Sequence, residues 1–318
     1  MLSFILRRIG LFCCSFFVLT LLIFWVHVRL DSEALLRFVP EYINYTSKLI
    51  YLDWGNNVET GAKIYDEIKL YFPQTFELIF ISLSLALLLG TFLGIICGLN
   101  HHSKLDKILG LFCQLTNSIP VYWLAQIFII IFAIKLKMLP TTGNMNLLYT
   151  IPNTTGISLI DALLTINPII IKDAFLHLIM PVCTLMIMPC AEITSIIRKA
   201  TIDVTKKNFF QAAQIRGMNV IKLAYKHVFP NVIQSVLPHT SIIICNLFSA
   251  CILVEVVFEW PGIGLWLIQS VTASQYSNIE PCVFFLAICL LIINIGTEIL
   301  CALFFKNNRN ISRTEDAM

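Results

Sequence analysis

The chain alternates between long apolar stretches and shorter polar ones, and six of the apolar stretches are long enough to cross a membrane. A helix needs about 20 mostly apolar residues to span the hydrocarbon layer. The predicted spans cover residues 9–28, 76–99, 108–134, 174–197, 237–258 and 279–305. Prolines at positions 120, 181 and 189 predict kinks in the third and fourth spans, because proline lacks the N–H that a helix requires.

The composition supports this interpretation and excludes several classes of protein. Hydrophobic residues make up 58% of the chain and charged residues only 13%, whereas about 25% of a soluble domain is charged. A soluble enzyme, a disordered regulator and a nucleic-acid-binding protein are therefore excluded, and the net charge of +3 is too small to indicate a polyanionic partner. We predict an all-α integral membrane protein surrounded by the lipid bilayer, because helices satisfy their own backbone hydrogen bonds.

The distribution of Lys and Arg predicts the orientation of the spans. If the N-terminus is cytoplasmic, fourteen of these residues fall in inner segments and eight in outer segments, although the outer segments are longer in total. Cytoplasmic loops of membrane proteins carry such an excess of positive charge. We therefore expect six spans with both termini in the cytoplasm.

Three connections are too long to be simple turns, and we expect them to have functions. Two are predicted to be outer loops, at residues 29–75 and 135–173, and the third is an inner loop at 198–236. The inner loop has the pattern of two short helices around Gly217, with apolar residues interleaved among basic ones. This pattern is typical of a helix that lies on a protein partner or at the membrane surface.

The chain lacks the motifs of an enzyme or a metal site. It contains no phosphate-binding GxxxxGK[ST] segment, no HExxH and no GxSxG, so it is not expected to hydrolyse ATP or to catalyse a reaction. The 11 cysteines lie in apolar runs without CxxC spacing, and the pair His101-His102 is interpreted as part of a solvated inner loop. We expect no cofactor and no metal.

Five acidic residues lie within or at the ends of the predicted spans, where a carboxylate is costly unless it contacts water or a partner. Glu77 and Glu280 are expected to contact water at the membrane interface. Glu192 and Glu255 are expected to line a translocation path or to face a partner subunit. The five acids are Glu77, Glu192, Glu255, Glu280 and Glu298.

The inner loop resembles the EAA loop of binding-protein-dependent ABC importer permeases, whose pattern is E-A-A-x3-G-x9-I-x-L-P. Residues 211–217 read QAAQIRG and residues 227–230 read HVFP. Two alanines, a glycine and a proline match the pattern, while Gln211 replaces Glu and His227 and Phe229 replace the aliphatic positions. In the family this loop docks on the ATPase subunit. The resemblance thus implies a coupling role for five residues, which are Gln211, Ala212, Ala213, Gly217 and Pro230.

Other segments resemble the oligopeptide and dipeptide permease branch of that family. They read LDWG at 52–55, FPQTFEL at 72–78, SIPVYWL at 118–124 and VEVVFEWPGIG at 254–264. Within the branch, the long second outer loop, together with Asn208-Phe209 in the inner loop, is similar to that of the B permease of Sap-type peptide transport systems.

The resemblance implies a type I ABC importer permease fold and a place in the bacterial inner membrane. It also implies a second homologous permease, ATPase subunits, a periplasmic substrate-binding protein and transport by alternating access. Peptides, including cationic antimicrobial peptides, would be the cargo. A putrescine or polyamine exporter is the alternative, and a channel or receptor without ATPase coupling is an alternative of another class.

A cationic cargo would be attracted by the acids near the outer ends of the second and fifth predicted spans, which are Glu77, Glu255 and Glu259. On this basis Glu255→Gln is expected to weaken the handling of a cationic cargo more than that of a neutral one. If Glu255 instead caps or pairs within the protein, every cargo would be affected equally.

Overall fold

The computed structural model describes the backbone of residues 2–30, 38–116, 118–149 and 151–315, and the side chains of residues 7–8, 10–25, 39–116, 118–149 and 151–303. Helices make up most of this part of the chain. They are α1 (Leu2–Leu30), α2 (Phe38–Ile50), α3 (Ile64–Leu99), α4 (Lys104–Thr116), α5 (Val121–Phe128), the π-helix η2 (Ile129–Lys135), α6 (Ser158–Leu164), α7 (Pro168–Thr205), α8 (Asn208–Ile215), α9 (Val220–Leu223), the π-helix η3 (Ala224–Val228), α10 (Phe229–Val232), the 3₁₀ turns η4 (Ile233–Ser235) and η5 (Leu237–His239), α11 (Thr240–Phe258), α12 (Ile263–Thr272) and α13 (Tyr276–Glu315).

Four helical runs in the described part are long and apolar enough to cross a membrane, which confirms an all-helical membrane protein. They are Ile64–Leu99, Pro168–Thr205, Val220–Phe258 and Tyr276–Leu303. The first predicted span lies within α1, whose described apolar part is Gly10–Trp25. That the chain has six membrane spans stays a prediction. Some of the positive charges used to predict the orientation, such as Arg29 and Arg37, lie outside the described side chains.

The third predicted span, residues 108–134, is bent near Pro120, where its sequence predicted a kink. It is divided into α4 and a second part, Val121–Lys135, and the two parts are bent by 106° relative to each other. Pro120 precedes the second part as its N-cap residue, with extended backbone angles. A proline at this position starts a helix and disfavours helical geometry in the residue before it. By contrast, α7 continues through both Pro181 and Pro189 as a single helix.

The most extensive contact between two helices in the described part of the chain is that of α3 with α7, and it depends on glycine. Gly90, Gly94 and Gly98 are four residues apart and form one stripe along α3. A Cβ atom at Gly94 would lie 2.7 Å from the Cβ of Ile197, and one at Gly98 would lie 2.4 Å from the Cβ of Thr201. Small residues at such a spacing allow the backbones of membrane helices to approach closely.

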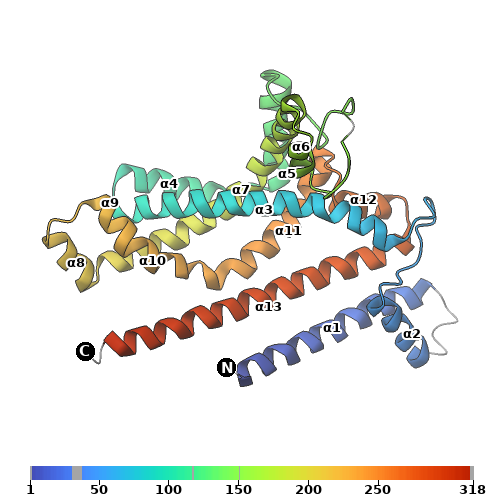
Figure 1. The fold of residues 1–318 in the computed structure, drawn as a ribbon, viewed down its shortest axis with the longest axis horizontal. Coiled ribbons are helices and arrows are strands. Elements are labelled where there is room, and N and C mark those ends of the chain that lie inside the picture. The colour runs from blue at the N-terminus through green and yellow to red at the C-terminus, as the bar shows by residue number, and fades with distance from the viewer. Residues whose placement is uncertain (1, 31–37, 117, 150, 316–318) are drawn as a thin grey trace.

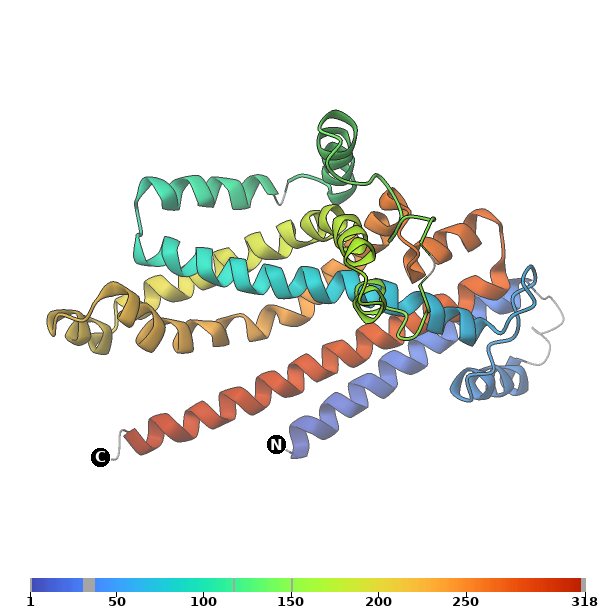
Figure 2. The same cartoon turned by 45° about the horizontal axis from the view of Figure 1, so that its top comes forward.

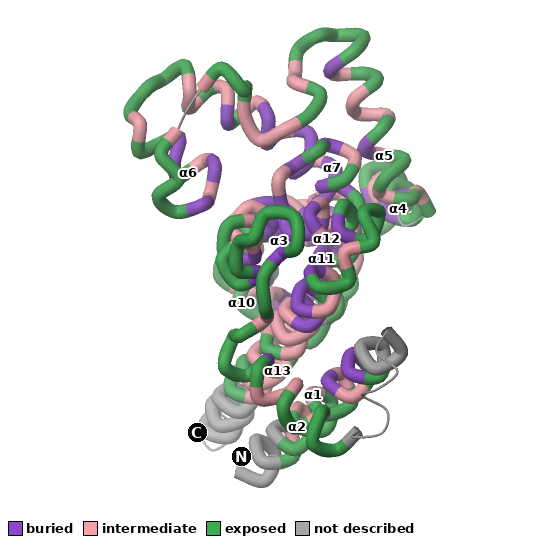
Figure 3. Tube along the Cα trace, turned by 90° about the vertical axis from the view of Figure 1, so that its right-hand side faces the viewer, coloured by how far each residue is buried: buried purple, intermediate pink, exposed green. Residues whose placement is uncertain are grey.

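The helices form an elongated molecule with two different ends. In Figures 1 and 2, α3, α7 and α11 run along the molecule, and α13 pairs with α1 below them. Arg8 and Glu298 form an ion pair of 2.9 Å within that pair. The two termini point toward the end that carries α8 and α9, while α2 and α12 lie toward the opposite end. Buried residues gather where α3, α7, α11 and α12 meet, as Figure 3 shows.

Replacing Gly94 by leucine should separate α3 from α7, because the new side chain has no space beside Ile197. We expect less assembled permease in the membrane and a lower midpoint of thermal unfolding in detergent. Gly110→Ala is the matched control, since Gly110 lies in α4 with nothing within 4 Å of an added Cβ. Equal stability of the two variants would contradict the close-packing account.

Candidate functional site

The inner loop contains a helix, a tight turn and a second helix, as its sequence pattern predicted. Helix α8 ends in a turn at Gly217, which has a φ of +76°. The N–H of Gly217 donates to the carbonyl of Gln214 (3.0 Å), and that of Met218 donates to the carbonyl of Ala213 (3.4 Å). This pair of hydrogen bonds closes the C-terminus of a helix around a residue with positive φ, which glycine adopts without strain. The side chain of Asn219 then caps the start of α9.

The loop has one face buried against the membrane helices and one face exposed. Phe210, Ala213 and Leu223 belong to a hydrophobic cluster, called the inner cluster, that also contains Ile193 and Ile197 of α7. The remaining buried members of the inner cluster are Ala86, Val204, Val228, Val232, Val236 and Ile243. The inner cluster therefore joins the loop to α3, α7 and α11.

The five residues that match the motif differ in their burial. Ala213 is buried in the inner cluster, whereas Gln211, Ala212, Gly217 and Pro230 are exposed. The side chain of Ile215 is also exposed, at 86%. Val220, Ile221 and Tyr225 of the following helices are exposed as well. Several exposed apolar side chains, and not a single one, indicate a surface that binds a partner.

Glu255 lies in the core of the chain, between α3, α11 and α12. Its carboxylate accepts hydrogen bonds from the hydroxyl of Thr75 (2.5 Å) and from the N–H groups of Gly264 (2.7 Å) and Leu265 (3.1 Å). The side chain is completely buried. An added Cβ at Gly262 would lie 2.2 Å from the carboxylate, so this turn requires glycine there. Glu255 thus caps the N-terminus of α12, where a carboxylate is favourable, and is out of reach of a cargo in this conformation.

Glu77 has a similar position at the outer loop, and the expectation that it contacts water is wrong. Its carboxylate accepts from the N–H groups of Ser158 (2.9 Å) and Leu159 (2.8 Å) at the start of α6, and only 2% of the residue is exposed. The outer loop folds over the acid because these two N–H groups have no partner within their own helix. Glu280 is partly exposed, and its contact with water stays a prediction.

Asp161 organises the part of the outer loop before α6. It accepts hydrogen bonds from the hydroxyl of Thr154 and from the N–H groups of Thr155 and Gly156. Burial raises the pKa of Asp161, but these hydrogen bonds outweigh it and hold the pKa below its ordinary value. The ionised carboxylate of Asp161 therefore stabilises this part of the outer loop fully near neutral pH. This contribution to the free energy of unfolding is lost as the pH falls through the lowered pKa.

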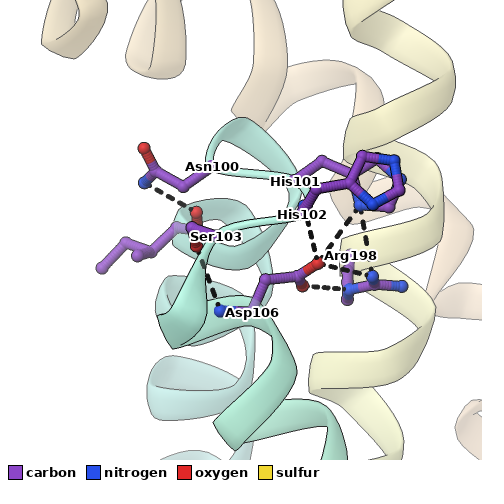
Figure 4. A network of polar contacts seen from close by, with 7 residues as sticks. Asn100, His101, His102, Ser103, Asp106 and Arg198 are labelled. Carbon is purple, nitrogen blue, oxygen red and sulfur yellow. Dashed lines mark hydrogen bonds and ion pairs between the residues drawn. The ribbon is translucent and has the colours of Figure 1, made fainter.

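The pair His101-His102 belongs to an ion-pair network between α4 and α7 (Figure 4). Asp106 is 4% exposed and accepts hydrogen bonds from the guanidinium of Arg198 (2.8 Å to Nη2) and from the N–H of His102 (3.1 Å). Nδ1 of His101 lies 3.2 Å from the same carboxylate. Sequence reasoning missed the network, although Asp106 is an isolated acid among basic residues of a short loop. The described residues contain no group of three His, Cys, Asp or Glu side chains that could hold a metal.

Glu192 occupies a small cavity between α5, α7 and α11. It shares the cavity with Val121, Pro189 and Asn246, among others. Its side chain is partly buried, and no hydrogen bond to its carboxylate occurs among the described residues. The two acids singled out by sequence are therefore not together. Glu255 is hydrogen-bonded within α3, α11 and α12, whereas the described side chains and backbone donate no hydrogen bond to Glu192.

Comparison with known proteins gives one family and several full-length relatives. The family model described as binding-protein-dependent transport system inner membrane component matches residues 90–310. The chain is 32% identical over 311 residues to a protein of Escherichia coli K12 named putrescine export system permease protein SapB, with 95% of this chain and 96% of the relative covered. The identity and the coverage are the same for the peptide transport system permease protein SapB of Escherichia coli O157:H7. A di/tripeptide transport system permease protein, DppB, of Pseudomonas aeruginosa UCBPP-PA14 is 30% identical, with 94% and 96% covered.

Replacing Glu255 by glutamine should destabilise the subunit, because the amide retains one acceptor oxygen where two N–H groups and a hydroxyl now donate. Each buried polar group left without a partner costs about 1–3 kcal/mol. We expect a lower midpoint of thermal unfolding and an equal reduction of uptake for cationic and neutral cargo.

Glu259→Gln is the control for this prediction, because it removes the same charge from an exposed position one turn away. If Glu255→Gln instead reduced the uptake of cationic cargo alone, with unchanged stability, a role in the cargo path would be supported and the capping role contradicted.

Proposed function

Since the chain belongs to the family of binding-protein-dependent transport system inner membrane components, we propose that it is a permease subunit that moves peptides across the inner membrane by alternating access. The chain is thus a multi-pass transport subunit and not an enzyme, and ATP hydrolysis belongs to partner subunits. The family description also implies a substrate-binding protein as a partner. We further propose six spans with cytoplasmic termini and a second, homologous permease subunit.

The observation that carries the proposal is the two-faced inner loop. Its exposed face, with Gln211, Ala212 and Ile215, offers a docking surface for an ATPase subunit. Its buried face, with Phe210 and Ala213, belongs to the inner cluster. A displacement of the loop by the ATPase would therefore be transmitted to α3 and α7 through packed side chains, since packed cores transmit strain and do not compress.

Peptide cargo is supported by the relatives named as peptide and di/tripeptide permeases. A polyamine such as putrescine is the second candidate, because the name of an equally similar relative refers to putrescine export. Both classes of cargo share amino groups. A channel or receptor without coupling is disfavoured, because it would have no use for a loop with this exposed docking surface.

The proposed function is tested by ATP-driven uptake into proteoliposomes that contain this chain, its second permease and their ATPases. Accumulation of a labelled peptide that needs both ATP and the binding protein is expected. Cargo flux that is independent of ATP and of the binding protein would instead support a channel. Accumulation of putrescine on the opposite side would support the exporter.

The proposed orientation predicts which loops an impermeant thiol reagent reaches in intact spheroplasts. In a version without native cysteines, Leu147→Cys in the outer loop should be labelled and Ile215→Cys in the inner loop should not. Both side chains are highly exposed, at 100% and 86%, so accessibility within the fold is matched. The chain is expressed without its ATPase subunits, which would cover position 215, and both positions should then react after the membrane is permeabilised. Labelling of position 215 without permeabilisation would reverse the orientation.

Replacing Gly217 by valine should uncouple ATP hydrolysis from transport. A β-branched residue at a φ of +76° is strained, so the turn between α8 and α9 would be distorted and the docking surface displaced. We expect the variant to insert and assemble, but to lose the stimulation of ATP hydrolysis by the loaded binding protein.

Gly61→Val controls for this strain, because Gly61 has a φ of +69° and lies in the predicted outer loop, with nothing within 4 Å of an added Cβ. It should keep the stimulation. Full stimulation in an assembled Gly217→Val complex would refute the coupling role.

A further inference from the structure

An apolar groove lies between the inner end of α3 and the helices α9, η3 and α10 of the inner loop, which are neighbours in Figure 1. Phe92 and Leu99 line it from α3, and Ile221, Tyr225 and Phe229 line it from the loop. Among the described residues, those that line the groove include none of α8, the helix that offers the proposed docking surface for an ATPase. The groove is therefore separate from that surface.

The groove lies at the boundary of the membrane. Its α3 wall belongs to the predicted span of residues 76–99, which ends at Leu99, the last residue of α3. Phe92 precedes Leu99 by two helical turns, which places it about 10 Å into the hydrocarbon layer. The opposite wall belongs to the inner loop. A molecule in the groove would therefore have one part among the lipid chains and another at the membrane surface.

The inner loop next to the groove is basic throughout. Residues 204–254 include five Lys and Arg residues and no Asp or Glu. A basic cluster directly beside a membrane helix is typical of a segment that binds anionic lipid head groups. All five basic side chains are exposed, and they are Lys206, Lys207, Arg216, Lys222 and Lys226.

Two of these lysines lie next to the lining of the groove. Lys222 directly follows Ile221, and Lys226 directly follows Tyr225. The two lysines are about one helical turn apart, so they share the helix face that adjoins the groove. A lysine stem can lie along apolar surface while its ammonium group stays in water. Tyr225 is itself 79% exposed, and tyrosine is enriched where the hydrocarbon layer meets water.

We propose that the groove binds an acyl chain of an anionic phospholipid, and that Lys222 and Lys226 bind its head group. The apolar lining and the depth of Phe92 favour an acyl chain over a polar ligand. The two lysines favour an anionic head group over a zwitterionic one. A lipid bound in this way contacts both α3 and the inner loop, and it is independent of the cargo that the permease moves.

The test is photo-cross-linking in nanodiscs that contain this chain, its second permease and their ATPases. The probes are phosphatidylglycerol and phosphatidylcholine that carry the same diazirine-labelled acyl chain, each added as a trace to unlabelled phosphatidylcholine. Mass spectrometry should find the anionic probe on groove residues such as Leu99 and Ile221, several-fold more often than the neutral probe. Equal labelling of the groove by the two probes, or labelling only outside it, would overturn the proposal.

Replacing both Lys222 and Lys226 by glutamine tests the head-group contact. The mole fraction of anionic probe that gives half-maximal labelling should rise about twentyfold, since each lysine near an anionic surface contributes about fivefold. Labelling by the neutral probe should not change. The matched control replaces Lys206 and Lys207, which are exposed between α7 and α8 and outside the lining, and it should have little effect. Equal effects of the two double variants would mean general attraction to a basic loop and would overturn the site.

A comparison of complexes with and without ATPase subunits separates a lipid from a protein as the occupant. Labelling of the groove should persist when the ATPases are bound. Labelling that occurs in the two permeases alone and disappears in the full complex would assign the groove to the ATPase and overturn the proposal. Ala224→Trp fills the groove with a large side chain, so it should abolish labelling at Leu99 by both probes. Unchanged labelling in that variant would contradict the acyl-chain site.

Discussion

The close approach of α3 and α7 is the constraint on which the rest of the structure depends. The three glycines of α3 let its backbone lie against Ile193, Ile197 and Thr201, so two of the long described spans are joined without bulky side chains between them. In a bilayer such contacts rely on van der Waals packing, because lipid is as apolar as the helix surface. Ile193 and Ile197 also belong to the inner cluster, so the same contact anchors the inner loop. A loop fixed in this way can move the two helices together.

A second constraint is that few polar groups can be left unpaired in a low-dielectric environment. Glu255 and Glu77 satisfy it by capping α12 and α6, and Glu298 satisfies it through Arg8. These acids hold short helices and the terminal pair of helices in place at the two ends of the molecule. Glu192 differs from these three acids, because no hydrogen bond or ion pair to its carboxylate occurs in the part of the chain that the structure describes.

Sequence reasoning found the features that depend on local pattern. Hydrophobic length placed the long helices, and the Ala-Ala-x3-Gly spacing placed the turn at Gly217, because span length and positive φ are properties of a few neighbouring residues. The helix α3 begins at Ile64, before the predicted span of residues 76–99 and within the segment predicted as an outer loop. Ile64 and Ile68 are one helical turn apart and are buried in the core, so tertiary packing extends toward its N-terminus a helix that hydropathy alone would begin later.

The partners of the acids could not be predicted, since they come from distant parts of the chain. Thr75 and Glu255 are 180 residues apart, and Asp106 and Arg198 are 92 apart. A carboxylate in an apolar run has the same sequence signature whether it caps a helix or lines a cavity. The distinction depends on which backbone N–H groups arrive beside it, and only the fold decides that. The same holds for the break at Pro120, whose presence indicated a kink but not an angle of 106°.

The central claim is that the inner loop moves as one body with α7, and a distance between spin labels tests it most directly. Labels at Gln211 in α8 and Lys199 in α7 are both exposed, and the distance between them can be measured by pulsed electron spin resonance in the assembled complex, with and without trapped ATP. A third label on the ATPase subunit reports that closure has occurred. The account predicts that the distance between Gln211 and Lys199 stays the same while the distance from Lys199 to the ATPase label changes. A change between Gln211 and Lys199 on ATP binding would show that the loop moves independently of α7, and would contradict the account.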